Sequence, residues 1–397
     1  MGCLFQSDAF QGFGPNALDR SEQPPDLVCV SGKRSTALRQ RVRKECPRHA
    51  GVYGMLSDRD ELIYVGKAKC LRSRLLSYFR RHSRDPKAGR ILRHTRAIVW
   101  EPASSEFAAL LRELELIRRW RPRFNVQGQP GRRRPAYVCV GRKPAPYIFL
   151  SRFPAKDTAC FGPVSASWRA REAVRRLNDV FQLRDCPQAQ TLLFAEQAEL
   201  FPVTRTPGCL RYEIHTCLGP CVGACARRDY MSQVRAAQAF LRGDDMALLE
   251  TMEREMTAAS EALAFERAGG LRDKLEAIRW LHERLERLRT ARDKQSFVYQ
   301  VQGDDGGEMW YVIHGGRVVA VFPRPQSRAE RRTLAQAIRK TFNKPLENDP
   351  VTSEQFDGVL LVAAWFRRHP DEKKRMLSPQ AAMRALKGVE PSLRHSG

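Results

Sequence analysis

The fold is decided by the stretch Gly51–Tyr53, which reads Gly-Val-Tyr, together with Tyr64–Lys69, which reads Tyr-Val-Gly-Lys-Ala-Lys. Each tyrosine stands in a short apolar segment, and a turn-forming run at Ser57–Asp60 separates the two segments. This pattern predicts a β-hairpin with strands over Val52–Leu56 and Leu62–Val65.

The residues that follow predict a small α/β unit around this hairpin. Leu71–Arg81 has apolar residues on one side at helical spacing, and Ala97–Glu101 suits a third strand. Glu106–Trp120 predicts a second helix, which begins after the N-cap residue Ser105 and ends before Pro122.

The charge of the chain favours a polyanionic partner. A chain of 397 residues is long enough for about two to four domains, and its formal net charge is +25. Residues 31–140 contain 27 Lys and Arg against 9 Asp and Glu, an excess of 18, whereas residues 227–295 contain 14 against 13. We therefore predict that the first region contacts nucleic-acid phosphates and the second contacts protein. Charge alone also leaves open a ribosome-associated basic protein.

The sequence contains no candidate membrane segment. No run reaches the roughly 20 consecutive apolar residues that cross a bilayer. Residues 1–11 lack the cationic and apolar regions of a signal peptide. We therefore expect a soluble, cytoplasmic protein with no membrane partner, whose 11 cysteines are not paired as disulfides.

The residue types between Tyr53 and Asn125 suit phosphodiester hydrolysis. This reaction needs a proton acceptor, positive charge near the phosphate and a carboxylate that holds a metal. The run Tyr64–Phe79, YVGKAKCLRSRLLSYF, and the segment Arg121–Asn125, RPRFN, supply tyrosines and cations. Together with Gly51–Tyr53 they resemble the GIY-YIG nuclease domain, in the form found in the nucleotide-excision-repair protein UvrC. The resemblance covers roughly residues 48–127.

This resemblance implies a role for each side chain of the site. Tyr53, Tyr64 or both would activate the attacking water, and nearby cations would have to favour the ionised phenol, whose pKa is ordinarily near 10. Arg74 would neutralise charge on the phosphate, and Lys67 would orient Tyr64 or water. Glu113 would hold Mg²⁺ or Mn²⁺. The remaining assignments are Tyr78 at the border of the site and Lys69, Arg72 and Asn125 on the DNA-binding side, Asn125 also fixing local backbone.

The choice of Glu113 rests on spacing. The metal-binding glutamate of the family stands twelve residues before a late asparagine, and Glu113 has that position relative to Asn125. Two other acids, Glu106 and Glu115, lie near it in the sequence. A lone tyrosine in a strand is usually a packing residue, so the whole spaced set carries the assignment.

Four cysteines predict a metal centre. Cys186, Cys209, Cys217 and Cys221 have the spacing C-x22-C-x7-C-x3-C, and four thiolates suit zinc or an iron–sulfur cluster. Unliganded buried cysteines are the alternative. The flanking runs FQLRDC and CLRYEIHTCLGPC resemble the cysteine-rich region of UvrC, which implies a [4Fe–4S] cluster, with zinc as the alternative.

A predicted helical hairpin follows the cysteines. Its mixed charges and apolar stripe suit a helix–helix interface, either with a partner or between copies of the chain. It resembles the UVR motif through which UvrC meets the helicase UvrB, although Gly269 and Gly270 replace better helix formers. The residues that carry the resemblance, and are assigned to partner binding, are Phe265, Glu266, Arg267, Leu271, Arg272 and Asp273.

These patterns divide an α+β chain into five parts. The parts are a disordered, basic tail over 1–46, the nuclease domain over 47–130, a linker and cysteine region over 131–226, the helical region over 227–295, and a small α/β domain with a tail over 296–397. In the last part we expect a strand hairpin, a helix over Ser327–Phe342 and a strand over Gly358–Ala364.

The favoured interpretation is a short UvrC-type or Cho-type endonuclease that makes one incision, 3′ of a DNA lesion, together with UvrB. Residues after 290 contain neither the spaced carboxylates of an RNase H-like nuclease nor paired helix-hairpin-helix motifs. Two alternatives remain: a non-catalytic adaptor that binds DNA and UvrB, and a GIY-YIG nuclease that acts outside excision repair.

Overall fold

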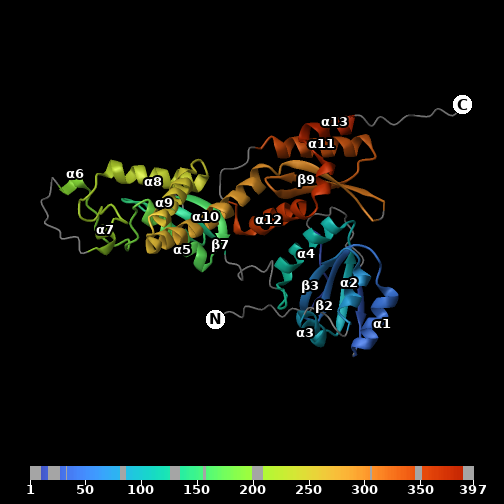
Figure 1. Cartoon of the computed structure of the whole chain (residues 1–397). Coiled ribbons are helices and arrows are strands. Elements are labelled where there is room, and N and C mark those ends of the chain that lie inside the picture. Colours follow the sequence, from blue (N-terminus) through green and yellow to red (C-terminus); the bar gives the residue numbers. More distant parts are fainter. Residues whose placement is uncertain are drawn as a thin grey trace. The chain divides into compact units, whose positions relative to one another are not determined.

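The computed structural model forms two compact units (Figure 1). Unit 1 comprises residues 1–132, 291–347 and 357–397, and unit 2 comprises residues 133–290 and 348–356. The residues that the structure describes are 10–16, 27–32, 34–80, 86–125, 135–154, 158–198, 209–304, 306–344 and 351–387. The two segments of unit 2 therefore alternate, in sequence, with the three segments of unit 1.

The first sheet of unit 1 has four antiparallel strands in the order β1-β4-β2-β3. The predicted hairpin is confirmed, since β2 (Gly51–Leu56) pairs with β3 (Leu62–Ala68), and β4 (Ala97–Pro102) is the predicted third strand. The fourth strand is β1 (Val28–Ser31). Four helices accompany the sheet: α1 (Ser35–Glu45), α2 (Leu71–Ser77), α3 (Pro86–His94) and α4 (Glu106–Trp120).

Both faces of this sheet are covered, which explains why every residue of β2 is buried. On one face Tyr53 and Met55 pack with apolar residues of α1, α2 and α3. On the other face Val52 packs with Ala109 and Leu116 of α4. Burial on both faces requires apolar side chains in alternate and intervening positions alike.

Helix α4 has the ends that the sequence predicts. The side chain of Ser105 accepts a hydrogen bond from the backbone N–H of Ala108, and Arg121, in the left-handed conformation, ends the helix before Pro122. These contacts satisfy backbone groups that a helix leaves free at its ends.

Within the predicted tail over residues 1–46, the sequence predicts a short basic helix over Thr36–Glu45, and α1 confirms it. The expectation of disorder is wrong for the described residues before that helix. Leu38 and Val42 of α1 and the following Cys46 are buried in the core of the first sheet, and Phe13 is buried on its other face. The sequence 1–36 has too few apolar residues to build a core alone, but these few fill places that the sheet leaves open. The remainder, 1–9, 17–26 and residue 33, lies outside the described residues.

The second sheet of unit 1 is formed by the C-terminal residues, in the order β10-β9-β8-β11. The predicted hairpin is confirmed in its three strands, β8 (Phe297–Gln302), β9 (Glu308–His314) and β10 (Arg317–Pro323), and β11 (Met376–Leu377) adds an edge. The helical elements are α11 (Arg328–Phe342), α12 (Ser353–Arg368), the 3₁₀ helix η1 (Pro370–Arg375) and α13 (Pro379–Lys387).

The predicted strand over Gly358–Ala364 is wrong, because these residues lie inside helix α12. Val359, Val362 and Phe366 are buried, at a spacing of three and four residues that suits a helix. The run is nearly continuous in apolar residues, and such a run does not distinguish a strand from a buried helix.

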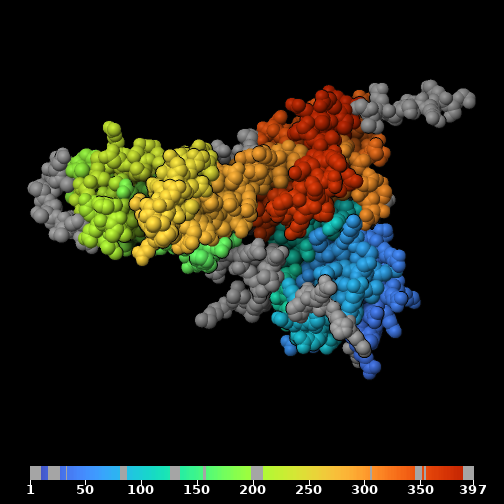
Figure 2. All heavy atoms as spheres, in the orientation of Figure 1, coloured from blue at the N-terminus to red at the C-terminus, as the bar shows by residue number. Residues whose placement is uncertain are grey.

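The two faces of the second sheet have different partners. Val298, Trp310 and Val312 pack with α11 and α13. The other face packs with α12 and with Phe107 of α4, so this sheet is continuous with the core of the first domain rather than a separate domain. Figure 1 shows α11 and α13 together beside β9, and in Figure 2 the orange and red atoms of the C-terminal residues lie against the teal atoms of α4.

Unit 2 combines a three-stranded sheet with helices. Its sheet has the order β6-β5-β7, with β5 (Pro135–Gly141), β6 (Tyr147–Ser151) and β7 (Ala159–Ser165). Its helices are α5 (Trp168–Val180), α6 (Ala195–Ala198), α7 (Leu210–Glu213), α8 (Arg227–Arg242), α9 (Ala247–Glu261) and α10 (Phe265–Asp293).

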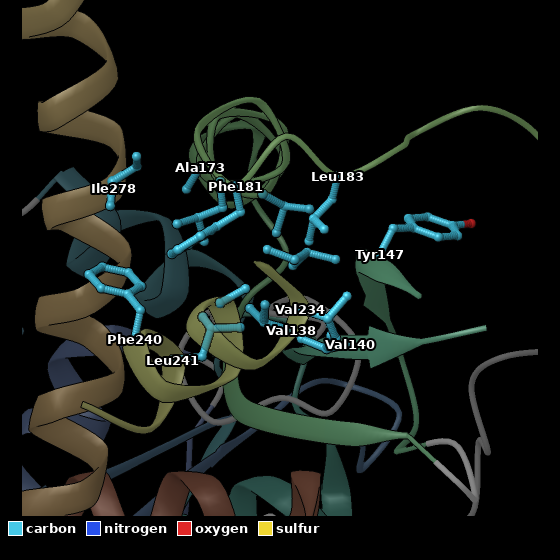
Figure 3. Packing of buried hydrophobic residues seen from close by; sticks show 14 of the residues in the cluster. Val138, Val140, Tyr147, Ala173, Phe181, Leu183, Val234, Phe240, Leu241 and Ile278 are labelled. Carbon is cyan, nitrogen blue, oxygen red and sulfur yellow. The ribbon is translucent and has the colours of Figure 1, made fainter. Parts of the chain in front are cut away.

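One core runs through unit 2 (Figure 3). Val138 and Val140 of β5 pack with residues of α5 and α8, and Ile278 of α10 closes the same cluster. The predicted boundary at residue 226 therefore does not separate two domains. Cys139 and Cys160 form a disulfide between β5 and β7, which corrects the expectation of unpaired cysteines.

Candidate active site

Three tyrosines meet on one face of the first sheet. Tyr53 comes from β2, Tyr64 from β3, and Tyr78 follows α2. Their ring centroids are 6.1–6.3 Å apart, and the hydroxyl oxygens of Tyr53 and Tyr78 are 2.8 Å apart. A hydrogen bond also joins Tyr64 and Tyr78, so the three phenols form one connected group.

The glycine of the second tripeptide makes room for this group. Gly66 lies opposite Tyr53 in the β2–β3 pairing. A Cβ atom on Gly66 would stand 2.5 Å from the hydroxyl oxygen of Tyr53, closer than such atoms approach. Only glycine therefore lets the phenol of Tyr53 lie across β3.

Arg74 of α2 brings a cation to the tyrosines. Its Nε donates a hydrogen bond of 3.3 Å to the hydroxyl of Tyr53, and its guanidinium carbon is 5.2 Å from the ring centroid of Tyr78. The residue is otherwise exposed, which leaves donors of the guanidinium facing solvent. Arg74 can thus contact an anion and a tyrosine together.

The pKa values of the three tyrosines are raised, whereas the sequence predicts that nearby cations lower them. Arg74 lowers the pKa of Tyr53, Tyr64 and Tyr78, as expected of a cation, but burial raises all three pKa values and outweighs it. The protein alone therefore keeps the phenols protonated. Ionisation of a tyrosine requires positive charge beyond that of the described side chains.

Two carboxylates of α4 meet Lys67. An oxygen of Glu113 accepts a hydrogen bond of 3.1 Å from the backbone N–H of Lys67, and an oxygen of Glu106 is 2.9 Å from its Nζ. The pKa of Glu106 is lowered, because the ion pair with Lys67 outweighs burial. Burial raises the pKa of Glu113, although Lys67 and Arg74 oppose this shift.

Glu113 fits a magnesium or manganese ligand. Its carboxylate is half-buried, lies within electrostatic reach of Tyr64 and Arg74, and carries a charge that burial disfavours. Mg²⁺ prefers hard oxygen ligands and often binds through one or two carboxylates, with water and phosphate oxygens completing its shell. Among the described residues no group of three or more His, Cys, Asp or Glu side chains is placed to hold a metal.

The structure thus brings together the six residues predicted to be catalytic. The DNA-binding assignments have mixed outcomes: Lys69 is exposed, while Nε of Arg72 donates to the carbonyl of Cys46 at 2.5 Å. Asn125 is buried, and its amide bonds both backbone groups of Val65 at 2.9 and 2.8 Å. These bonds confirm the expectation that Asn125 fixes the local backbone, here that of β3, whereas its assignment to DNA binding stays a prediction.

Two residues near the site were not assigned from the sequence. In the sequence Glu106 is only an alternative to Glu113 as the metal ligand, yet in the structure it binds Lys67 directly. The seven-residue interval between these acids, which places both on one face of a helix, was the signal available. Nζ of Lys87 in α3 lies 5.6 Å from the ring centroid of Tyr64, a contact that no sequence pattern indicates.

The four predicted cluster ligands do not form a metal centre in the described residues. Burial raises the pKa of Cys217 to about 11, which opposes the thiolate that a metal requires. Sγ of Cys186 lies 3.4 Å from Nη1 of the buried Arg184. Cys217 lies within electrostatic reach of Cys209 and Cys221, and the added Cys225, which is buried with a pKa raised to about 12, lies within reach of Cys217 and Cys221. The assignment of a cluster to Cys186, Cys209, Cys217 and Cys221 stays a prediction.

The helical hairpin formed by α9 and α10 presents an apolar tip. The side chains of Leu263 and Phe265 are 72% and 66% exposed. Glu266, Arg267 and the Arg272–Asp273 ion pair are also exposed, whereas Leu271 is half-buried. Helix α10 runs unbroken through Gly269 and Gly270. In the described part of the chain no helix is long and apolar enough to cross a membrane.

Family models match three successive segments. Residues 49–126 match the UvrC-like GIY-YIG domain, residues 136–240 match the middle domain of the UvrC/Cho excinuclease, and residues 247–279 match the UvrB/uvrC motif. The first segment, with its tyrosines, Arg74 and Glu113, is therefore a GIY-YIG domain. With the other two segments in this order, the chain is a UvrC-like protein.

Curated relatives agree with these matches. The UvrABC system protein C of Bdellovibrio bacteriovorus is 31% identical over 285 residues, which are 70% of this chain and 43% of the relative. That of Methanosarcina barkeri is 33% identical over 65% of this chain and 47% of its own length. The chain thus spans less than half the length of these relatives. Among solved structures, the magnesium-bound GIY-YIG endonuclease domain of UvrC from Thermotoga maritima is 30% identical, with 23% of this chain and 99% of that chain covered and a TM-score of 0.21.

Proposed function

We propose that this chain is a metal-dependent endodeoxyribonuclease of nucleotide excision repair, which hydrolyses one DNA phosphodiester 3′ of a lesion together with a UvrB-like helicase. The observation that carries the proposal is the convergence of Tyr53, Tyr64, Tyr78, Lys67, Arg74 and Glu113 around β3. Phenols, a cation with free donors and a half-buried carboxylate are the parts that this hydrolysis requires.

The residues divide the work as follows. Tyr64 would receive the proton of the attacking water in its phenolate form, because its side chain is only partly buried whereas Tyr53 is fully enclosed. Since burial raises the pKa of Tyr64, its ionisation would need positive charge beyond that of Arg74, and a metal ion on Glu113 would supply that charge. Tyr53 and Tyr78 hold Tyr64 and Arg74 in place through their hydroxyls. Arg74 binds the phosphate, and Glu113 holds Mg²⁺ or Mn²⁺. When bound, the metal supplies charge neutralisation at the leaving 3′ oxygen.

The partner proposal rests on the exposed tip of the α9–α10 hairpin. Leu263 and Phe265 are apolar side chains that the fold leaves in solvent beside exposed charges, as in interfaces between helices. We assign this tip to a UvrB-like helicase. Phe265→Ala should weaken capture of UvrB in a pull-down, whereas Met246→Ala, an exposed apolar residue at the far end of α9, should not.

No step of the reaction is assigned to the predicted metal cluster. A [4Fe–4S] cluster, or zinc, on Cys186, Cys209, Cys217 and Cys221 rests on the resemblance alone. Metal analysis of anaerobically purified protein tests it. About four irons per chain would establish the cluster, and about one zinc would establish the alternative. A protein that contains neither metal, and whose melting temperature does not change when metal is added, would reject both the iron–sulfur and the zinc assignment.

The nuclease proposal is tested by incision of a lesion-bearing duplex on which UvrB is loaded, with Mg²⁺. We expect a single nick 3′ of the lesion from the wild-type chain, and a loss of about 100-fold or more for Glu113→Gln and Tyr64→Phe. Glu61→Gln, which changes an exposed glutamate in the β2–β3 turn, is the matched control and should cut normally.

Each alternative has its own signature in the same experiment. Tight binding of DNA and UvrB with no nick from any variant would leave the adaptor. Nicking that needs neither a lesion nor UvrB, but still needs Glu113, would leave a nuclease that acts outside excision repair.

A further inference from the structure

Helix α4 connects the site to the C-terminal sheet, because its three faces have three different partners. Ala109 and Leu116 face the first sheet. Glu106 and Glu113, two turns apart, meet Lys67 at the site. Phe107 faces the second sheet, supported by the partly buried Leu110 and Leu111.

Phe107 is fully enclosed by aromatic side chains of the C-terminal sheet. Its ring centroid is 5.2 Å from that of Tyr299 in β8, 5.0 Å from that of Tyr311 in β9 and 5.3 Å from that of Trp365 in α12. Both tyrosine contacts are edge-to-face, with interplanar angles of 85°. Such an enclosure fixes the position of the ring, and with it the first turn of α4.

Polar contacts hold the start of α4 and, farther along, its last turn. The backbone N–H of Asp304, in the β8–β9 connection, donates to the carbonyl of Ser104, just before the N-cap. The carboxylate of Asp304 accepts from the N–H of Ala50 at 3.0 Å. Near the end of α4, Arg118 pairs with Asp357 of α12 at 3.4 Å. The C-terminal residues therefore contact α4 from its first turn to its last.

We propose that residues 296–304, 306–344 and 357–387 position α4 for cleavage, with Phe107 and Trp365 as positioning residues for Glu106 and Glu113. This inference rests on the proposed function. Phe107 is the neighbour of Glu106, whose oxygen stands 2.9 Å from Nζ of Lys67. Release of the ring would let this turn move, and a reactive site tolerates misplacement of only about 0.5 Å. The nuclease is incomplete without the C-terminal sheet.

The test measures Mn²⁺ binding to the full chain without DNA, by electron paramagnetic resonance. Phe107→Ala should weaken binding by about tenfold, the loss typical when the support of a metal ligand is removed. Phe107→Leu, which refills most of the volume, should recover most of it. Leu334→Ala is the matched control: it opens a cavity on the opposite face of the same sheet, away from α4, and should bind Mn²⁺ as the wild type does.

Two outcomes would overturn the proposal: unchanged Mn²⁺ binding by Phe107→Ala, or equal weakening by Leu334→Ala. If Phe107→Ala does not fold, Mn²⁺ binding is measured on the milder variant Trp365→Phe. Unchanged Mn²⁺ binding by that variant would overturn the proposal. Failure of the proposed function has a different signature. A wild-type chain that binds Mn²⁺ through Glu113 but never nicks DNA would refute the nuclease and leave the positioning of Glu113 standing.

Discussion

The charge that Glu113 needs to bind a metal reduces the stability of the folded chain. Burial raises its pKa, so the folded chain holds this proton more tightly than the unfolded chain does. A carboxyl group whose pKa is higher in the folded chain stabilises the fold while it is protonated. This stabilisation is complete at pH values below the pKa of the unfolded chain, about 4.5, and is lost as the pH rises through the pKa of the folded chain. At neutral pH the charged group therefore reduces stability.

Glu113→Gln should consequently raise the melting temperature while it abolishes incision. The gain should be larger at pH 8 than at pH 4.5, because only at the higher pH does the wild type carry the disfavoured charge. Thermal unfolding of both proteins at the two pH values measures it. A lower melting temperature for Glu113→Gln at pH 8 would contradict the assignment.

Arg112 is a second residue whose charge is held inside unit 1. It is 2% exposed, binds both oxygens of the buried Glu101 at 3.0 and 3.1 Å, and pairs with Glu115 at 2.9 Å. Arg112→Met should lower the free energy of unfolding by about 3–5 kcal/mol, because it leaves the charge of Glu101 uncompensated. Denaturant titration checks the value.

A double variant separates this cause from lost packing. Arg112→Met with Glu101→Met removes both charges and should recover a large part of the loss. If the double variant is as unstable as Arg112→Met alone, packing of the arginine stem and not its charge carries the effect.

Site residues could be predicted where residues close in the sequence also lie close in the fold. Tyr53, Tyr64 and Arg74 follow from one hairpin and the next helix. The backbone role of Asn125 was also expected, from the resemblance. The approach of Lys87 to Tyr64 depends on how distant segments pack. No local pattern contains that information, and the same holds for the sign of the tyrosine pKa shifts, which burial decides.

At the scale of elements, the helical hairpin offers a direct test of propensity. Gly269 and Gly270 lie within α10, and a Cβ atom at either position would meet nothing within 4 Å. Gly269→Ala and Gly270→Ala should each stabilise the helix by about 1 kcal/mol. Urea unfolding of the single variants measures this gain.

A loss of stability in either variant would show that the glycines serve close packing that the hairpin makes only with a partner. The control is Ala262→Gly, just after α9, where a comparable exposed position should lose stability or be neutral.

Helices with a clear polar face were predictable, and a helix whose exposed positions are also apolar was not. Glu106–Trp120 and Arg328–Phe342 alternate apolar and charged residues at helical spacing, and both are helices. Helix α12 buries one face, which includes Val359, Val362 and Phe366, but partly buried and exposed positions such as Leu360 are also apolar. The sequence therefore shows no helical periodicity there, which led to the wrong prediction of a strand. Strand β1 and helix α1 escaped prediction as core elements because most of their side chains face solvent.

At the scale of the whole molecule, removal of residues 296–387 should damage the first domain rather than detach an independent one. Phe107, Leu110 and Leu111 would become exposed. Loss of the burial of Phe107 alone costs about 1.5–3 kcal/mol. We expect a truncated chain to melt at a lower temperature and to bind a hydrophobic dye. A chain 1–295 that melts as the wild type does would show that the second sheet is dispensable for folding.

The division of the chain into domains was the least predictable property. Sequence patterns mark the ends of helices and strands, but not which of them share a core. The contact of Phe107 with Tyr299 joins residues 192 positions apart. The interleaving of the three segments of unit 1 with the two segments of unit 2 follows from such contacts alone.

This interleaving sets an order of events during protein synthesis. A ribosome releases Glu113 long before Trp365, and at roughly 5–20 residues per second the delay is on the order of 10–50 seconds. During that time residues 133–290, with the hairpin assigned to the helicase, are already outside the ribosome. Under the proposed function, the nascent chain would therefore present the hairpin to a helicase before the residues that position α4 have been made.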